Sequence, residues 1–256
     1  MHVKTQSAMQ TNRYVLENYF RSDKKPAIVY VGSSLLNQLD FSEESPCVYS
    51  LAMSGGSALT GLNAIFLDTS TKPRLVFVEI NVPQRGSDNA LIAKASAMLP
   101  RISSLFLTEN MPMNRALTYL YQFKREKLGS ETNDVIRQLG LALQTREYAI
   151  PLAPEVIENS MAEFRQLKIK LERQGTELVF LEMPVHPELE NLPQATQIRA
   201  AFRKTFPDNK FITYEELAKS SKIETIDGVH LTIEEGNIVI SNLKPHHNEA
   251  CSKQSG

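Results

Sequence analysis

The sequence predicts an α/β fold: a parallel β-sheet in one three-layer domain whose helices cover both faces of the sheet. Short runs of β-branched and other apolar residues alternate with segments in which apolar residues recur at helical spacing. Strands that alternate with helices are joined by right-handed crossovers and therefore lie parallel. No Gly-, Ser- or Pro-rich linker and no internal repeat divides the 256 residues, so a single domain is expected.

The predicted strands are compact runs rich in apolar residues. The strongest is Arg74–Ile80, which is apolar on both faces, as in a strand that helices cover on both sides. Four further runs complete the expected sheet: Ala27–Val31, Cys47–Leu51, Leu178–Leu181 and Lys210–Thr213.

Helices are predicted between these strands. The longest is Pro154–Arg173, because proline is well tolerated in the first turn of a helix and Gly175 closes the segment. The tail from Lys244 is polar and is expected to be frayed. The other helices outside the middle of the chain are Asn12–Phe20, a helix through Leu59, Leu62, Ile65 and Phe66, Ala195–Phe206 and Glu234–Leu243.

A long segment, about residues 82–151, separates the third strand from the next core helix and exceeds ordinary connections. Helices are predicted in it near Leu91–Leu99, Arg115–Lys127 and Glu131–Leu143. Two interpretations are open. The segment is either a helical cap inserted beside the cleft, where it would set acceptor specificity, or a decoration packed against the edge of the sheet.

The composition excludes several classes of protein. A hydrophobic fraction of 42% with 28 Lys+Arg against 29 Asp+Glu is typical of a folded globular chain rather than a disordered one. A net charge of −1 gives no electrostatic footprint for nucleic acid, so no nucleic-acid partner is expected. No run approaches the roughly 18–20 apolar residues of a membrane span.

The ends of the chain and its cysteines carry few signals. The opening stretch MHVKTQSAMQTNRYV lacks the apolar core of a secretory signal. Cys47 and Cys251 cannot form a disulfide framework, and Cys47 is expected to be buried and inert. No Cys/His cluster has the spacing of a zinc site, and the histidine pair His246-His247 is expected at most to make adventitious metal contacts in the tail.

Three strand ends carry residues capable of chemistry, at the edge where parallel α/β sheets place their active sites. Gly32-Ser33-Ser34-Leu35 follows the first strand, and its serines are either a nucleophile or the N-cap of a helix. Ser54-Gly55-Gly56-Ser57 follows the second, where a glycine amide could donate to an oxyanion or the segment is a plain turn. Asn81 ends the third, either as a further oxyanion donor or as a strand terminator.

A fourth candidate lies before the closing helix. In Asp227-Gly228-Val229-His230, a general-base histidine could be oriented by the aspartate three residues earlier, across a turn. The alternative is a surface loop with a lone histidine. His186 follows the fourth strand between two prolines, so a structural or substrate-contacting role is favoured there over catalysis.

Taken in order, the serine, the glycine, the asparagine and the Asp-x-x-His pair resemble the SGNH (GDSL-like) hydrolase family. Gly32-Ser33-Ser34-Leu35 resembles its first block with Ser34 as nucleophile, Gly55 resembles the second-block glycine, and Asp227 and His230 resemble the fifth-block pair. The resemblance implies a flavodoxin-like α/β/α sandwich with a five-stranded parallel sheet. It also implies a Ser-His-Asp site whose oxyanion is held by Ser34, Gly55 and Asn81, with no metal or organic cofactor.

The chain departs from the family in two blocks. Ser33 stands where the family usually has Asp, and Glu79-Ile80-Asn81-Val82-Pro83 replaces the usual Gly-x-Asn-Asp. Such divergent third blocks are similar to those of SGNH-like domains that O-acetylate bacterial cell-surface polysaccharides. The resemblance therefore implies acyl transfer on carbohydrate O-acyl esters, by an O-acetyltransferase or an acetylesterase, through acyl-Ser34. The implied partners are an acylated carbohydrate and a membrane acyltransferase that supplies the acyl group.

Two other functions stay open at this point. The altered blocks also fit a catalytically degenerate SGNH domain that binds a glycan or a partner protein. A lipolytic or thioester-cleaving enzyme is the third reading. The expected location is that of a soluble domain, which is extracytoplasmic (periplasmic) if an upstream anchor was removed and cytoplasmic otherwise.

Overall fold

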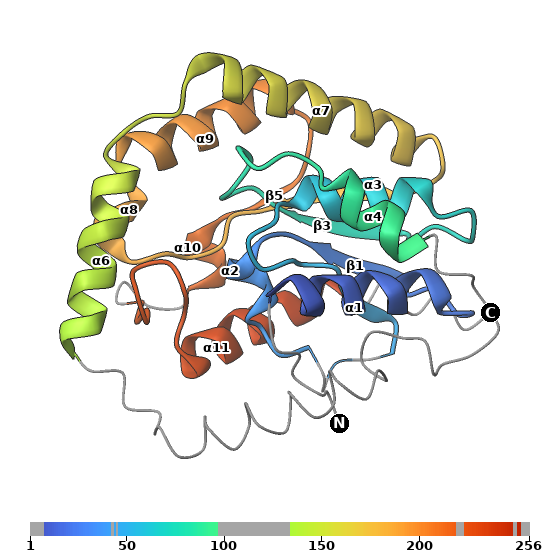
Figure 1. The fold of residues 1–256 in the computed structure, drawn as a ribbon, viewed down its shortest axis with the longest axis horizontal. Helices are drawn as coiled ribbons and strands as arrows, with labels where there is room; N and C mark the ends of the chain where they lie inside the picture. The colour runs from blue at the N-terminus through green and yellow to red at the C-terminus, as the bar shows by residue number, and fades with distance from the viewer. Residues whose placement is uncertain are drawn as a thin grey trace.

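A computed structural model of the chain describes residues 8–41, 44, 46–96, 134–218, 223–247 and 250–251. Its centre is a five-stranded sheet with the order β2-β1-β3-β4-β5, and the strand pairs are parallel (Figure 1). The predicted parallel α/β fold is therefore confirmed. The strands are β1 (Ile28–Val31), β2 (Val48–Ser50), β3 (Leu75–Glu79), β4 (Glu177–Leu181) and β5 (Phe211–Ile212).

Helices cover both faces of the sheet because its strands present apolar side chains alternately to each side. Val29 and Val31 of β1 belong to one buried cluster, and Ile28 and Tyr30 belong to the other. The first cluster packs under α1 (Ala8–Arg21), α3 (Ala58–Leu67), α4 (Asn89–Ser96), α7 (Pro154–Glu172) and α9 (Pro193–Thr205). The second packs under α2 (Ser34–Asn37), α8 (Pro187–Glu190), α10 (Tyr214–Leu217) and α11 (Ile233–Leu243).

The order of the strands places a crevice beside β1. Because β2 and β3 lie on opposite sides of β1, the sheet has its topological switch point between β1 and β3. Ligands of open α/β sheets bind outside the carboxyl ends of the strands at such a point. Residues that follow Val31 and Glu79 are therefore the ones to examine for function.

The middle of the chain matches the prediction only in part. Two of its expected helices are present, as α4 and as α6 (Asp134–Tyr148), which extends five residues beyond the predicted end at Leu143. The helix predicted over Arg115–Lys127 lies outside the described residues. A cap role for this segment thus stays a prediction. None of the described helices combines the length and apolar character that a membrane span requires.

The C-terminal segment packs against the sheet, so the expectation that it is frayed from Lys244 is wrong for residues 244–247 and 250–251. A 3₁₀ turn, η3 (Lys244–His246), leads to His247, which is buried with its Nε2 atom 2.5 Å from Tyr30 Oη. Tyr30 in turn stacks between Phe41 and Phe77, each with its ring centroid 4.6 Å away. A polar tail therefore docks because its histidine is a hydrogen-bond partner for a phenol inside an aromatic stack.

A disulfide bond also fixes this segment. Cys47, just before β2, is bonded to Cys251, with 5.9 Å between their Cα atoms and 204 residues between them in sequence. The expectation that Cys47 is an inert thiol is therefore wrong. The sequence did not predict this disulfide bond, because Cys251 reaches the start of β2 only when the C-terminal segment folds back onto the sheet.

Reduction of this disulfide is expected to lower the free energy of unfolding by about 2–4 kcal/mol, because the bond restricts a long loop in the unfolded chain. The measurement is urea unfolding with and without reductant. A Cys47→Ser/Cys251→Ser double variant is the control, and its unfolding midpoint should match the reduced protein and ignore reductant. Equal midpoints for the oxidised and reduced wild-type protein would contradict the prediction.

Candidate active site

The sequence left open whether the serines after β1 act as a nucleophile or as a helix N-cap, and in the structure the two neighbouring serines have different environments. Ser33 is the N-cap of α2, because its Oγ atom accepts a hydrogen bond from the Leu35 amide at 3.2 Å. Ser34 is the first residue of the helix, and its Oγ atom lies 3.0 Å from His230 Nε2. The helix therefore begins properly without using the Ser34 hydroxyl, which stays available for chemistry.

His230 is held by Asp227 on the side opposite Ser34. Its Nδ1 atom lies 2.7 Å from Asp227 Oδ2, while Asp227 Oδ1 accepts hydrogen bonds from the amides of Val229 and His230 at 3.1 and 2.9 Å. Gly228 makes this turn possible with a φ of +100°, which other residues rarely adopt. The structure thus brings together all three residues predicted as a triad, although Ser34 and His230 are 196 positions apart.

Electrostatics keep Asp227 ionised. Partial burial pushes the pKa of its carboxyl group up, but hydrogen bonds from the His230 side chain and backbone and from Val229 outweigh that effect, and the pKa lies below its ordinary value. An ionised Asp227 holds the Nδ1–H tautomer of His230, which leaves Nε2 free to accept a proton from Ser34. The arrangement can therefore perform nucleophilic acyl transfer.

The turn after β2 is tied to the helix that carries Ser34. Ser54 Oγ accepts a hydrogen bond from Asn37 Nδ2 of α2 at 2.9 Å. Gly55 follows with a φ of +74°, and no atom lies within 4 Å of the position that a Cβ would occupy there. The turn therefore presents open backbone at Gly55. The oxyanion role predicted for the Ser34 and Gly55 amides stays a prediction.

Asn81 has a visible structural function. Its Nδ2 atom donates to the Met183 carbonyl at 2.9 Å, and its Oδ1 atom accepts from the Met183 amide at 2.8 Å. This pair of hydrogen bonds joins the loops that follow β3 and β4, and it continues the contact between the two strands beyond their ends. The predicted oxyanion role of Asn81 is not tested by these contacts and stays a prediction.

Glu79, the last residue of β3, is a site residue that sequence reasoning missed. It is buried, its Oε2 atom accepts from the Ser33 amide at 2.7 Å, and its Oε1 atom accepts from the Ser33 hydroxyl at 2.7 Å. Burial raises the pKa of its carboxyl group to about 7, although the hydrogen bonds from Ser33 act in the opposite direction. Gly32 is required beside it, since a Cβ there would lie 2.5 Å from Glu79 Oε2.

A signal for Glu79 was present in the sequence. An acid at the end of an otherwise apolar buried strand needs a nearby donor, because an unpaired buried charge is costly. Ser33 is that donor, at the position where the resembled family usually has Asp. The two positions at which the chain differs from the resembled motifs are therefore in direct contact, since Ser33 donates to the Glu79 carboxylate.

The helix α6 packs directly against the loop that carries Asp227. A Cβ on Gly140 would lie 2.8 Å from Asp227 Cβ, and a Cβ on Gly228 would lie 3.1 Å from Leu141 Cδ1. Each surface therefore has a glycine where the other approaches. His186 supports the same loop, because its amide donates to the Gly228 carbonyl at 2.8 Å, while its side chain caps α8.

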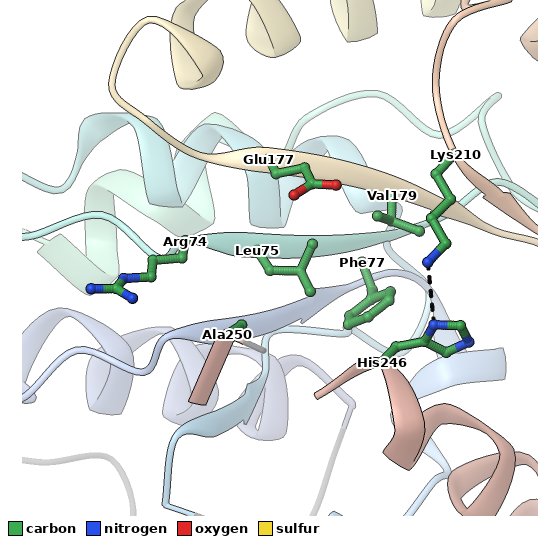
Figure 2. A pocket seen from close by; sticks show the side chains of 8 residues that line it. All are labelled: Arg74, Leu75, Phe77, Glu177, Val179, Lys210, His246 and Ala250. Carbon is green, nitrogen blue, oxygen red and sulfur yellow. Dashed lines mark hydrogen bonds between the residues drawn. The ribbon is translucent and has the colours of Figure 1, made fainter. Parts of the chain in front are cut away.

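A cavity of about 190 Å³ lies between the sheet and the C-terminal segment, which contributes His246 and Ala250 to its wall (Figure 2). Leu75 and Glu177, from the amino ends of β3 and β4, contribute to its wall, so it lies away from the carboxyl edge that carries Ser34. His246 Nδ1 lies 3.3 Å from Lys210 Nζ at one end of it, and burial and that lysine lower the pKa of His246. Within the described part of the chain no cluster of three or more metal-binding side chains is found.

The comparisons with known proteins give likeness in structure only, since no family model and no curated protein sequence matches the chain. The chain is similar to a proposed acylhydrolase from Bacteroides fragilis NCTC 9343, with a TM-score of 0.50 and 11% identity over 95% of this chain and 98% of that one. A GDSL-like lipase from Bacteroides thetaiotaomicron VPI-5482 gives a TM-score of 0.48 and 13% identity, over 95% and 100% of the two chains. The parallel sheet and the likeness to the acylhydrolase show that this chain and that protein share an α/β fold.

Proposed function

We propose that the protein is an SGNH-type serine enzyme that acts on carbohydrate O-acyl esters, as a polysaccharide O-acetyltransferase or an acetylesterase. The observation that carries this proposal is the continuous chain of contacts from Asp227 through His230 to Ser34, at 2.7 and 3.0 Å. Such a chain supplies a nucleophile, a general base and a group that orients the base.

In the proposed reaction, Ser34 Oγ attacks the acyl carbonyl carbon while His230 Nε2 takes the hydroxyl proton. The tetrahedral oxyanion is stabilised by the amides of Ser34 and Gly55, with Asn81 as a third donor. Collapse of this intermediate breaks the ester bond, and His230 gives its proton to the leaving alcohol. Water or a sugar hydroxyl then attacks acyl-Ser34, and His230 again takes the proton from the attacking oxygen.

The carbohydrate part of the proposal rests on the divergent third block, Glu79-Ile80-Asn81-Val82-Pro83, and on its likeness to polysaccharide-acetylating domains. A membrane acyltransferase would supply the acyl group if the protein is a transferase. The acylhydrolase and lipase named among similar structures support ester chemistry but not a particular substrate. A lipolytic or thioester-cleaving enzyme is distinguished by its preference among acyl chain lengths.

A fluorophosphonate probe is expected to modify Ser34, because the probe reacts with serines activated by a general base. The adduct is located by mass spectrometry of the peptide that contains Ser34. A His230→Ala variant is the matched control and should label far more slowly while remaining folded. Absence of an adduct in folded wild-type protein would overturn the proposal and favour a domain that binds a glycan or a partner protein.

Product analysis separates the two forms of the enzyme. The wild-type protein is incubated with an acetylated oligosaccharide in the presence and absence of a free oligosaccharide. Release of acetate alone supports an acetylesterase, and acetylation of the free oligosaccharide supports a transferase. Ser34-dependent turnover of long-chain lipid or thioester substrates, with none on the sugar esters, would contradict the carbohydrate assignment.

A further inference from the structure

A cavity of about 250 Å³ adjoins the turn that carries Gly55. It lies between α1, the turn after β2 and the loop that joins β3 to α4, with apolar walls that include Met53 and Leu91. Pockets for drug-sized ligands are larger, about 300–1,000 Å³, so this cavity suits a group of a few carbon atoms. Its size therefore matches a short acyl chain rather than a lipid chain.

The cavity shares its wall with the proposed reaction site. Gly55 contributes to the wall and is also the predicted oxyanion donor. The preceding residue, Ser54, is bonded to Asn37 of α2, the helix that begins at Ser34. In an acyl-enzyme, the acyl chain extends from the carbonyl carbon away from Ser34 Oγ. A cavity that begins at the oxyanion glycine is placed to receive that chain.

The wall of the cavity contains an unneutralised cation, Arg85. Within the described part of the chain its guanidinium forms no hydrogen bond and no ion pair. Asp88, which also lines the cavity, uses its Oδ1 atom to accept a hydrogen bond from the Leu91 amide at 2.9 Å. Burial raises the pKa values of Glu79 and Tyr148, and the charge of Arg85 opposes both increases, so the guanidinium lies near the carboxyl group that contacts Ser33.

Asn12 also lines the cavity and connects α1 to the turn after β2. Its side chain is buried, with 8% of the residue exposed, and its Nδ2 atom donates to the Ser54 carbonyl at 2.8 Å. Its Oδ1 atom has no hydrogen-bond partner. Its hydrogen bond to Ser54 ties α1 to the turn that carries Gly55 and fixes that side of the cavity.

We infer that this cavity is the acyl-binding site and that it selects short acyl chains ending in a carboxylate, which Arg85 binds. The apolar walls contact the methylene groups, and Arg85 pairs with the terminal carboxylate. The inference rests on the proposed function, since it assigns the acyl group of the same serine reaction. It extends the substrate class from acetyl esters to half-esters of short dicarboxylic acids.

The test compares three esters of one chromogenic phenol, with acetyl, butyryl and hemisuccinyl groups. The wild-type protein is expected to favour the hemisuccinyl ester over the butyryl ester in kcat/KM. Arg85→Ala should lower kcat/KM for the hemisuccinyl ester by about 10-fold or more, because a charge-assisted contact is lost, and should leave the butyryl ester nearly unchanged. Arg85→Lys should restore part of the loss, and Lys94→Ala, on the exposed face of α4, is the matched control.

Two results would overturn the inference. One is equal use of the butyryl and hemisuccinyl esters by the wild-type protein. The other is an equal loss on all three esters in Arg85→Ala, which would mean that Arg85 acts on the reaction centre rather than on the acyl chain. Failure of the proposed function would give a different result, because none of the three esters would then be hydrolysed in a Ser34-dependent manner.

Discussion

Ser34→Ala is expected to abolish ester turnover and to leave the protein folded. Removing the nucleophile of a serine triad lowers kcat by a factor of about 10⁴ or more. The fold should tolerate the change, because the Ser34 hydroxyl contacts His230 while the cap of α2 is formed by Ser33. The measurements are p-nitrophenyl acetate hydrolysis and the urea midpoint of the same preparations.

Ser33→Ala is the matched control, since it removes the hydroxyl of the neighbouring serine, which caps the helix and does not contact His230. It removes a helix cap, for which about 1 kcal/mol of stability is typical, and a donor to Glu79, but it keeps the nucleophile. We expect it to lower stability and to retain part of the activity. Turnover that persists in Ser34→Ala would reject the assignment of the nucleophile, whatever the Ser33 variant does.

Glu79→Ala is expected to lower kcat by about 10²-fold with little change in KM, because Ser33 loses its three hydrogen bonds to the carboxylate and the loop that carries Ser34 shifts. Glu79 acts here as a positioning residue. Glu79→Gln keeps one carbonyl oxygen for the Ser33 amide and should therefore retain more activity than the alanine variant. Equal losses in both variants would show that the hydrogen-bond geometry is not what Glu79 supplies.

The ionisation of Glu79 can also be followed through the pH dependence of the free energy of unfolding, independently of any reaction rate. Burial raises the pKa of this carboxyl group to about 7 from the 4.5 of an ordinary glutamate, so the folded protein binds the proton more tightly than the unfolded chain. The stability supplied by this proton is present below about pH 4.5 and is lost as the pH rises through 7, by roughly 3 kcal/mol.

Glu79→Gln cannot titrate at this position, so its free energy of unfolding should fall less than that of the wild-type protein between pH 5 and pH 8. Urea unfolding of both proteins at several pH values measures the difference. Parallel curves would contradict a raised pKa at Glu79. They would not affect the assignment of Ser34, which rests on separate contacts.

Local patterns were sufficient for the sheet and for proposing the three residues that the structure brings together, Ser34, His230 and Asp227. Apolar runs such as Arg74–Ile80 identify buried strands without knowledge of their neighbours. Parallel strands end at one edge of the sheet, so Ser34 at the end of one strand was expected there. Asp227 and His230 could be proposed as a pair because they are close in sequence and their spacing suits a turn.

The features that the sequence did not predict depend on contacts between distant segments. The Cys47–Cys251 bond and the His247–Tyr30 contact exist only because the tail returns to the sheet. The bonds between Asn81 and Met183 likewise join two loops that are 102 positions apart. A polar tail and an asparagine at a strand end are locally ordinary, so nothing in their own neighbourhoods marks them.

The close contact between Gly140 and Asp227 places α6 directly against the acid of the proposed triad. Since no side chain separates the helix from the acid, a shift of α6 by a few tenths of an ångström must be taken up by the Asp227 backbone or by its hydrogen bond to His230. A substitution on α6 that moves the helix would therefore act on the hydrogen bond between Asp227 and His230.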